Sequence, residues 1–326
     1  MFDVTIIGGG PAGLTAGMFC RMRKMTVLIV EAGRPGGQLV SLYGDKPVHD
    51  WPGHRDIIAN DLAGHLVGHA RELDVEIVER QKVLDLSRGD EGFELLANDL
   101  VSGQEHRYRG GAVIVAIGGG AFEPRKLRVA GEDDLGEDQL TYRMPDRSKV
   151  AGKKVVVVGG GDSGLESAQS AHQAGAHVTM IQVLDRFTGM ESNIDLVNQM
   201  EIPRHFNTRV KDLELADGAL RAVVAQTKGA AAPLRLECDV LVVNIGAAVN
   251  LDAVKRWGIA TEGNQIRVDA AMHTSVEGVF ACGDIVTYES KYKLLITAAS
   301  EGAIAANAAY LYVRKPGRLT MTDLYT

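Results

Sequence analysis

Short apolar runs rich in valine and isoleucine recur along this chain, and most of them end at glycine. They cover residues 3–7, 27–30, 112–117, 154–158, 178–181 and 240–245. Because these runs are short and nearly free of polar positions, they predict strands that are buried on both faces, as in a parallel sheet. Helix-compatible stretches at 14–22 and 165–173 separate two pairs of these strands. The pattern predicts an α/β fold with two strand–helix–strand units.

The two units repeat each other at an offset of 151 residues. The offset joins the glycines of two G-x-G-x-x-G fingerprints: Gly8 and Gly159, Gly10 and Gly161, Gly13 and Gly164. Each triplet follows a strand and opens a helix, which is the setting in which G-x-G-x-x-G holds the pyrophosphate of a dinucleotide. Glycine supplies 38 of the 326 residues, about 12% against a usual 7%, and these turns explain much of the excess. We therefore predict two dinucleotide-binding domains.

The residue that binds the adenosine ribose is expected about 20 residues after the fingerprint. In the first unit this residue is Glu31, and the same offset places Gln182 in the second unit, followed by Val183 and Leu184. The second site thus has neither the acid that favours NAD nor an immediate arginine for a 2′-phosphate. Gln182 can still hydrogen-bond a ribose hydroxyl. The sequence leaves open whether the second site has kept its nucleotide.

Composition excludes several classes of protein. The chain is 45% hydrophobic and 24% charged, as in ordinary globular proteins, and its net charge of -7 argues against a nucleic-acid partner. No apolar run is long enough to span a membrane, and no secretory leader is evident, so we expect a cytoplasmic protein with no membrane partner. The cysteines, Cys20, Cys238 and Cys282, are too widely spaced for a local dithiol. His65 and His69 are expected on a solvated helix face, with no metal site.

Further motifs point to one family. They are G-G-Q-L at 36–39, W-P-G at 51–53, G-G-A-F-E-P at 119–124, G-G-D-S at 160–163 and G-V-F-A-C-G-D at 278–284. With them the chain resembles the low-molecular-weight thioredoxin reductase superfamily, and more narrowly the ferredoxin/flavodoxin-NADP reductases of thioredoxin-reductase-like type. The resemblance implies two Rossmann-like domains, one inserted into the other. The FAD-binding domain takes residues 1–120 and 248–326, and the NAD(P)-binding-like domain takes 121–247.

The resemblance also implies site residues. The candidates for FAD contacts are Gly8, Gly10, Ala12, Gly13, Glu31, Gly37, Gln38, Tyr43, His49, Val83, Ala116, Gly118, Phe122, Gly283 and Asp284. The candidates at the second site are Gly159, Gly161, Asp162, Ser163 and Gln182. Asp284 is expected to bind the ribityl chain, and a helix after Leu295 to aim its N-terminus at the flavin. His49 is either a ring stacked on the isoalloxazine or a surface histidine, and both interpretations stay open.

The chain departs from the family pattern at two places. Thioredoxin reductases carry a C-x-x-C just before the second fingerprint, whereas T-Y-R-M-P-D stands here at 141–146. A dithiol relay at that position is therefore excluded. The basic His-Arg-Arg cluster that binds the NADP phosphate in these families is replaced by Gln182, Val183 and Leu184. The choice between NADPH and NADH is therefore open.

The sequence favours an FAD-dependent oxidoreductase that transfers electrons between NADPH or NADH and ferredoxin or flavodoxin, and the family resemblance implies a homodimer. The flavin carries the chemistry, so no catalytic side chain is expected. One alternative is a flavin reductase of disulfide or other small-molecule type that uses NADH or ferredoxin, and another is a non-enzymatic flavin-binding redox sensor. The acidic stretch 132–138 is expected to be an exposed linker, and the basic cluster from Arg143 to Lys154 is a candidate surface for an acidic carrier.

Overall fold

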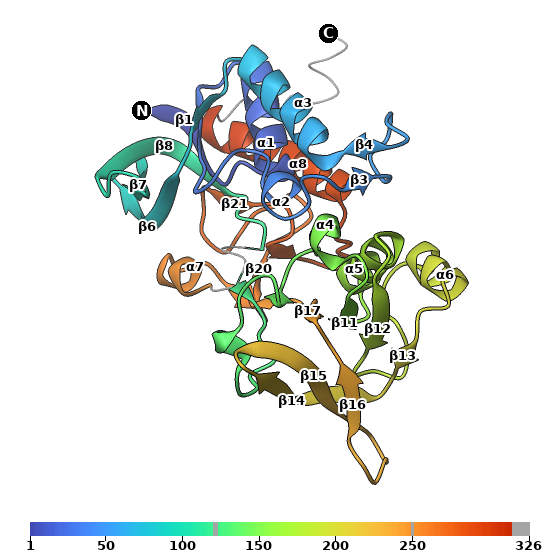
Figure 1. Ribbon diagram of the computed structural model, residues 1–326. Coiled ribbons are helices and arrows are strands. Elements are labelled where there is room, and N and C mark those ends of the chain that lie inside the picture. Colours follow the sequence, from blue (N-terminus) through green and yellow to red (C-terminus); the bar gives the residue numbers. More distant parts are fainter. Residues whose placement is uncertain (120–122, 249–250, 315–326) are drawn as a thin grey trace. The chain divides into compact units, whose positions relative to one another are not determined.

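The computed structural model describes residues 1–119, 123–248 and 251–314. The chain forms two compact units, of which one holds Met1–Ala121 and Val249–Thr326 and the other holds Phe122–Ala248. The second unit is therefore inserted into the sequence of the first, which confirms the predicted fold class (Figure 1). The unit boundaries fall one residue after the predicted domain boundaries. That these units are separate domains remains a prediction.

The first unit is built on a parallel sheet in the order β5-β2-β1-β8, with β21 paired to the far side of β8. Its strands are β1 (Phe2–Ile7), β2 (Val27–Val30), β5 (Glu76–Val78), β8 (Glu105–Val115) and β21 (Val279–Ala281). The apolar runs at 3–7 and 27–30 form β1 and β2 as predicted. The sheet brings β21, from the end of the chain, into register with β8, so the two segments of this unit share one core.

Strand β8 joins the parallel and the antiparallel part of one seven-stranded sheet, and its sequence explains why. Its first residues alternate in exposure and pair antiparallel with β7 (Gly92–Asp99), which pairs in turn with β6 (Gln81–Gly89). Its last four residues are all buried, because they lie between β1 and β21 in the parallel part of the sheet. Alternation is typical of a strand with one solvated face, and a continuous apolar run is typical of a strand covered on both faces.

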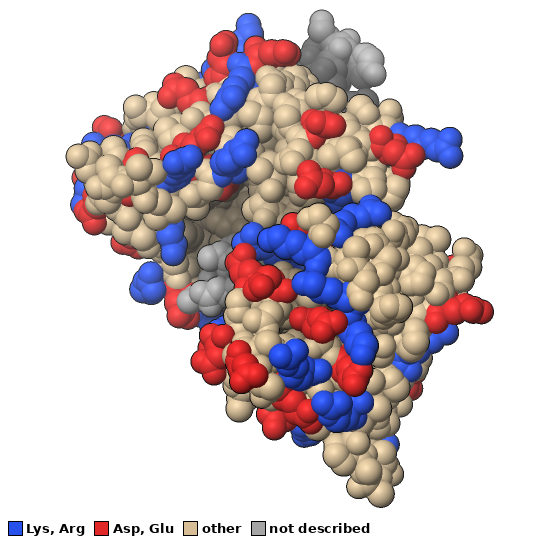
Figure 2. Space-filling view, viewed as in Figure 1, with Lys and Arg blue, Asp and Glu red and all other residues tan. Residues whose placement is uncertain are grey.

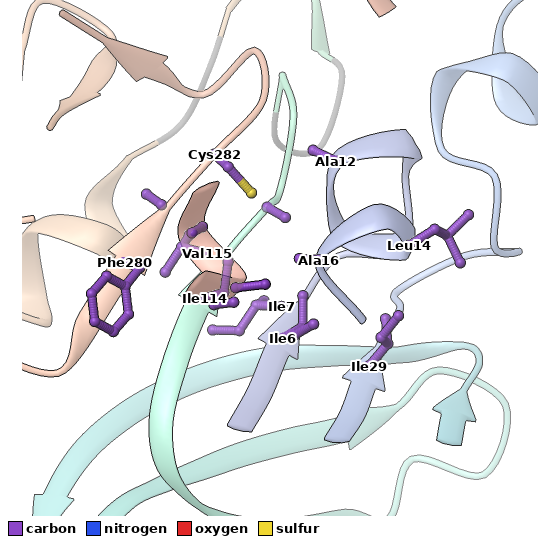
Figure 3. Close-up of a cluster of buried hydrophobic side chains, with 14 of the residues drawn as sticks. Ile6, Ile7, Ala12, Leu14, Ala16, Ile29, Ile114, Val115, Phe280 and Cys282 are labelled. Carbon is purple, nitrogen blue, oxygen red and sulfur yellow. The ribbon is translucent and has the colours of Figure 1, made fainter. Parts of the chain in front are cut away.

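Three helices pack together in the first unit: α1 (Pro11–Met22), α3 (Ala59–Glu72) and α8 (Leu295–Arg314). The helices α1 and α8 touch closely, since a Cβ built on Gly302 would lie 2.2 Å from the carbonyl oxygen of Ala12. Figure 3 shows the apolar side chains of β1, β2, β8 and β21 meeting those of α1. The remaining elements are α2 (Gln38–Ser41), β3 (Pro47–Val48), β4 (Ile57–Ile58), α7 (Asp252–Arg256), β19 (Thr261–Glu262), β20 (Gln265–Arg267) and β22 (Val286–Thr287).

The second unit has a five-stranded parallel sheet in the order β10-β17-β11-β12-β13. Its strands are β10 (Leu140–Thr141), β11 (Lys154–Val158), β12 (His177–Ile181), β13 (Arg204–His205) and β17 (Val240–Val243). Helix α5 (Asp162–Gln173) joins β11 to β12, and α6 (Glu191–Gln199) follows β12. An antiparallel sheet of β14 (Thr208–Ala216), β15 (Ala219–Thr227) and β16 (Leu234–Glu237) completes the unit, with β9 (Glu123–Pro124) and β18 (Ala247–Ala248) paired at its ends.

The stretch 132–138 lies within the second unit and so is not a linker between units, but five of its seven residues are exposed as predicted. Glu132 opens the 3-10 helix Glu132–Asp134 and is only 4% exposed. Its carboxylate accepts hydrogen bonds from the backbone N–H groups of Leu127 and Arg128 and from the hydroxyl of Tyr142. Three donors compensate the burial of this charge, so the prediction of exposure was wrong for this one residue, which was judged by its charge alone.

Candidate functional site

The first glycine turn lies between β1 and α1 and has no room for side chains. Gly8 has a φ of +106°, and a Cβ on it would lie 2.4 Å from the carbonyl oxygen of Ala116. A Cβ on Gly13 would lie 2.0 Å from the carbonyl oxygen of Gly8. Gly10 is the N-cap of α1 and Pro11 is its first residue, so the helix begins three residues earlier than predicted. The turn therefore presents a bare helix N-terminus, which suits a pyrophosphate.

Glu31 follows β2 and reaches back to this turn. Its Oε2 accepts a hydrogen bond from Gly9 N at 2.6 Å, and its Oε1 accepts one from Gly33 N at 2.7 Å. A carboxylate has about four lone-pair sites, so each oxygen keeps capacity for a ribose hydroxyl. The predicted ribose-binding acid is thus held beside the fingerprint by two backbone donors.

The segment after Gly33 folds over the same turn. Gly36 N donates to Gly9 O at 2.8 Å, and a Cβ on Gly37 would lie 2.8 Å from Gly10 Cα. Gln38 begins α2, and its Nε2 lies 3.8 Å from the position a Cβ on Gly118 would take. The structure therefore brings Gly37, Gln38 and Gly118 together around the first fingerprint.

Three further candidates, Tyr43, His49 and Val83, make no contact with the first glycine turn that the structure shows. Tyr43 packs on the core of the first unit, with the Lys46 ammonium 5.3 Å from its ring centroid. His49 is exposed, and its Nδ1 lies 2.5 Å from Asp56 Oδ1. Val83 stands at an irregularity in β6 and is partly buried. These roles toward a flavin remain predictions, and Phe122 lies outside the described residues.

The Gly283 and Asp284 turn follows β21 and meets the start of α1. Gly283 has a φ of +86°, and its Cβ would lie 3.1 Å from the Cβ of Ala12. Burial raises the pKa of Asp284, and the nearby Lys293 and Lys291 oppose that rise. The Asp284 carboxylate accepts no hydrogen bond from any residue in the described part of the chain. A partly buried carboxylate without a donor is suited to accept one from a ligand hydroxyl.

Sequence reasoning missed a buried ion pair behind this turn. Glu301 on α8 and Lys291 are paired, with side chains only 2% and 6% exposed. Glu301 accepts from Gly283 N at 2.8 Å and from the Tyr288 hydroxyl at 2.8 Å, while Lys291 Nζ donates to Gly283 O at 3.1 Å. Both polar backbone atoms of Gly283 are thus fixed. A signal existed, because Glu301 is the only acidic residue in the alanine-rich helix α8.

The second glycine turn repeats the geometry of the first. Gly159 has a φ of +123°, and its Cβ would lie 2.1 Å from Asn244 O. The Cβ of Gly164 would lie 2.3 Å from Gly159 O, and Gly161 is the N-cap of α5. Asn244 Oδ1, beside this turn, is buried with no hydrogen-bond partner in the part of the chain that the structure describes. An unsatisfied buried acceptor costs about 1–3 kcal/mol, so the site fits a ligand that brings a donor.

The N-terminus of α5 is tied to the loop after β12. Asp162 Oδ1 accepts from Met190 N at 2.8 Å and from Asn193 Nδ2 at 2.9 Å, and Thr188 N donates to Gly160 O at 2.8 Å. Ser163 is half-buried beside Asp162. Asp162 therefore braces the turn, and its contact with a nucleotide remains a prediction.

Gln182 occupies the position that Glu31 holds in the first unit. A Cβ on Gly160 would lie 2.8 Å from Gln182 Nε2, just as a Cβ on Gly9 would lie 3.3 Å from Glu31 Oε2. Gln182 is buried, and both ends of its amide serve its own loop: Nε2 donates to Arg186 O at 3.2 Å, and Oε1 accepts from Val183 N at 3.0 Å.

A cavity of about 380 Å³ opens in the second unit, away from this turn. It lies where β11 and β12 begin, between Lys154, His177 and Ile202. Ligands of open parallel sheets bind at the opposite edge, outside the carboxyl ends of the strands. The cavity is therefore not the nucleotide site.

The three thiols are buried and free. Burial raises the pKa of Cys20 and of Cys238 to about 12, and burial together with the Glu301 charge raises the pKa of Cys282 further. Figure 3 shows Cys282 in the core between β21 and α1. A thiol that stays protonated is a poor nucleophile, so these cysteines serve packing. Among the described residues there is no cluster of side chains that could hold a metal, and no helix combines the length and apolar character needed to cross a bilayer.

Comparisons with known proteins agree with this geometry. A family model described as pyridine nucleotide-disulphide oxidoreductase matches residues 2–302. Ferredoxin–NADP reductase 2 of Shouchella clausii is 35% identical, covering 98% of this chain and 95% of that protein. Ferredoxin–NADP reductase of Thermus thermophilus is 34% identical, covering 95% of this chain and 92% of that protein. The solved thioredoxin reductase of Lactococcus lactis aligns with a TM-score of 0.86 at 26% identity, covering 97% of this chain and 100% of that one.

Proposed function

Because the chain belongs to the pyridine nucleotide-disulphide oxidoreductase family, we propose that it passes electrons between a nicotinamide nucleotide and ferredoxin or flavodoxin. It is an oxidoreductase that uses FAD and NAD(P)H. One observation carries the proposal: two glycine turns of the same geometry stand in a chain that is 35% identical to a ferredoxin–NADP reductase over nearly its whole length.

The residues of the first unit fit FAD. The N-terminus of α1 would hold the pyrophosphate, Glu31 the adenosine ribose and Asp284 the ribityl chain. Bound FAD supplies the hydride and single-electron chemistry that no side chain of the protein provides. The protein's own part is to hold and orient. Glu301 and Lys291 fix Gly283, which in turn sets the backbone that carries Asp284.

The second unit offers a surface suited to an acidic carrier. Arg143 and Arg147 are exposed, and neither forms an ion pair with a residue in the described ranges. Lys149 is exposed as well and lies 4.0 Å from Asp146. On the face that Figure 2 shows, basic and acidic side chains are largely intermixed. A local basic group steers an acidic partner even on a protein of net negative charge.

Disulfide reduction through the protein's own thiols is the less favoured function. All three cysteines of the chain are buried, and their pKa values are raised. A relay needs a thiolate that a substrate can reach. The segment 141–146, where a dithiol would stand, contributes Tyr142 to the Glu132 cluster instead.

Anaerobic mixing of the FAD-loaded protein with NADH, NADPH and reduced ferredoxin in turn tests the proposal. We expect the flavin absorbance to bleach with a nicotinamide nucleotide and with reduced ferredoxin. Bleaching by neither nucleotide would contradict the proposal, and turnover of disulfides with no turnover of ferredoxin or flavodoxin would favour the small-molecule alternative. A protein that bleaches yet passes electrons to no acceptor would be a redox sensor.

The carrier surface has its own test. The double variant Arg143→Glu/Arg147→Glu should raise the KM for ferredoxin and weaken its salt dependence, while flavin bleaching by nucleotide stays unchanged. An unchanged KM would place the carrier elsewhere. We also propose that the protein is cytoplasmic and, on the strength of the family resemblance, that it is a homodimer, whose mass sedimentation velocity measures.

A further inference from the structure

Resting on the proposed function, we propose that the second turn takes a nicotinamide nucleotide without a 2′-phosphate, NADH, and that Gln182, Val183 and Leu184 set this preference. The residue at the end of the second strand of such a unit faces the adenosine ribose. That strand is β12, and these three residues follow it directly. They therefore decide whether a 2′-hydroxyl or a 2′-phosphate is accommodated.

None of the three residues carries a charge. A phosphate monoester carries about -1.5 to -2 charges at neutral pH, and proteins hold it with arginine or lysine. Val183 and Leu184 instead present apolar side chains that are 50% and 46% exposed. A 2′-phosphate placed here would lose water without gaining a cation, whereas an adenine ring gains apolar surface to lie against.

Gln182 is suited to a hydroxyl. One N–H and the carbonyl of its amide are already used by Arg186 O and Val183 N, which leaves one N–H and one lone pair. The free N–H can donate to a ribose hydroxyl, and the free lone pair can accept from the same hydroxyl. Because the amide is neutral, it does not repel a phosphate as a carboxylate would, so the preference for NADH is expected to be moderate.

The cations nearest in sequence are already engaged. Arg186 lies 3.2 Å from Asp185 Oδ1, and the loop 182–190 carries no further basic residue. Arg204, on the neighbouring strand β13, donates to Asn198 and lies 5.9 Å from the ring centroid of Phe187. The Asp185 carboxylate adds repulsion toward a phosphate. The charges along this loop sum to zero.

The test compares NADH with NADPH on the FAD-loaded protein. We expect the bleaching rate divided by the nucleotide Kd to favour NADH by about tenfold or more, with ~1.4 kcal/mol for each factor of ten. Calorimetric titration of NAD⁺ and NADP⁺ should give the same order of affinity. Val183→Arg/Leu184→Arg should raise NADPH efficiency by about tenfold, because it adds two cations at the strand end, while NADH changes little.

A matched control separates this local effect from added positive charge in general. Leu100 and Val101 form an equivalent pair of adjacent apolar residues in the first unit, 53% and 70% exposed. Leu100→Arg/Val101→Arg should leave the ratio of NADH to NADPH efficiency unchanged. An equal response of both double variants would overturn the role of Val183 and Leu184.

The outcomes separate this inference from the proposed function. Bleaching by NADPH as fast as or faster than by NADH, with matching affinities, would overturn the inference and leave the proposed function standing. Bleaching by neither nucleotide, with no binding of NAD⁺ or NADP⁺, would overturn the proposed function and the inference with it. Bleaching and tighter binding with NADH support both.

Discussion

The two glycine turns share a backbone and differ in the side chain that completes them. At Gly13 and Gly164 a Cβ would strike the carbonyl oxygen of the turn's first glycine, so the backbone dictates glycine in both units. At the ends of β2 and β12 no such constraint acts, and Glu31 stands in one unit while Gln182 stands in the other. The glycines thus indicate that a turn can bind a dinucleotide, and the residue at the strand end indicates which dinucleotide it binds.

The turns also differ in how they are braced. Beside the first glycine turn, the buried pair of Glu301 and Lys291 fixes Gly283 in the turn that carries Asp284. The second is braced from its own loop, where Asp162 binds the start of α6. The Gly283–Asp284 turn beside the first fingerprint therefore depends on a distant helix, whereas the second glycine turn depends on neighbouring residues of its own loop.

Breaking the distant brace should have the largest effect. Glu301→Ala leaves the Lys291 ammonium buried without its partner, so we expect the free energy of unfolding to fall by about 3–5 kcal/mol. Urea unfolding followed by flavin fluorescence measures this loss for the first unit. The exposed Glu289→Ala is the control, and a Glu301→Ala variant as stable as that control would refute the brace.

Adding one methyl group to each turn should separate their functions. Gly13→Ala forces a Cβ against Gly8 O and Gly164→Ala forces one against Gly159 O, each at a cost of about 1–3 kcal/mol. The first variant should lose FAD and its visible absorbance, whereas the second should stay yellow and lose bleaching by NADH. Gly64→Ala, in open space on α3, is the control and should retain both. Loss of FAD from both variants alike would contradict separate sites.

Much of this comparison follows from sequence. The strands β1, β2, β11 and β12 and both glycine turns were predicted because their signals are local: an apolar run, a tight turn and a helix start. The helices begin earlier than predicted, since Pro11 and Asp162 belong to the first turn of α1 and α5.

The parts that sequence missed depend on tertiary contacts. Lys291 and Glu301 are ten residues apart and meet only because α8 packs beside β21. Glu132 was predicted to be exposed because it begins an acidic stretch. The three donors that allow its burial, one of them the Tyr142 hydroxyl, cannot be inferred from that stretch. His49, predicted either to stack or to be exposed, is exposed beside Asp56, and a stacked role remains a prediction.

Removing the strand-end side chains should have a smaller and unequal effect. Glu31→Ala removes the charged acceptor that we propose for the adenosine ribose, and hydrogen bonds to a charged group contribute about 1.5–3 kcal/mol. The Kd of FAD for the apoprotein should therefore rise by about tenfold or more. Gln182→Ala removes the neutral partner that we propose for the ribose of NADH, whose hydrogen bonds contribute about 0.5–1.5 kcal/mol, so the Kd of NADH should rise less. Fluorescence titration measures both constants, and equal losses would remove the distinction between the two residues.

The smallest effect concerns pH and Asp284. Burial raises its pKa in the folded protein, so without FAD the folded state binds more protons than the unfolded state between the two pKa values. The stability of the apoprotein should therefore fall as pH rises through that window, from about pH 4 upward. Asp284→Asn should flatten this part of the profile and weaken FAD binding. If the melting temperature of the Asp284→Asn apoprotein varies with pH just as that of the unaltered apoprotein does, the raised pKa of Asp284 is contradicted.

Together, the two proposals require that the flavin unit exchanges electrons with a nicotinamide nucleotide bound at the neutral second turn and with ferredoxin. A single experiment supplies reduced ferredoxin and NAD⁺ to the FAD-loaded protein and follows NADH by its near-ultraviolet absorbance. Because a hydride carries two electrons and ferredoxin carries one, we expect one NADH for every two ferredoxins oxidised, with NADP⁺ reduced at about a tenth of that rate or less. Oxidation of ferredoxin with no nucleotide reduced, or reduction of NADP⁺ in preference to NAD⁺, would contradict these proposals.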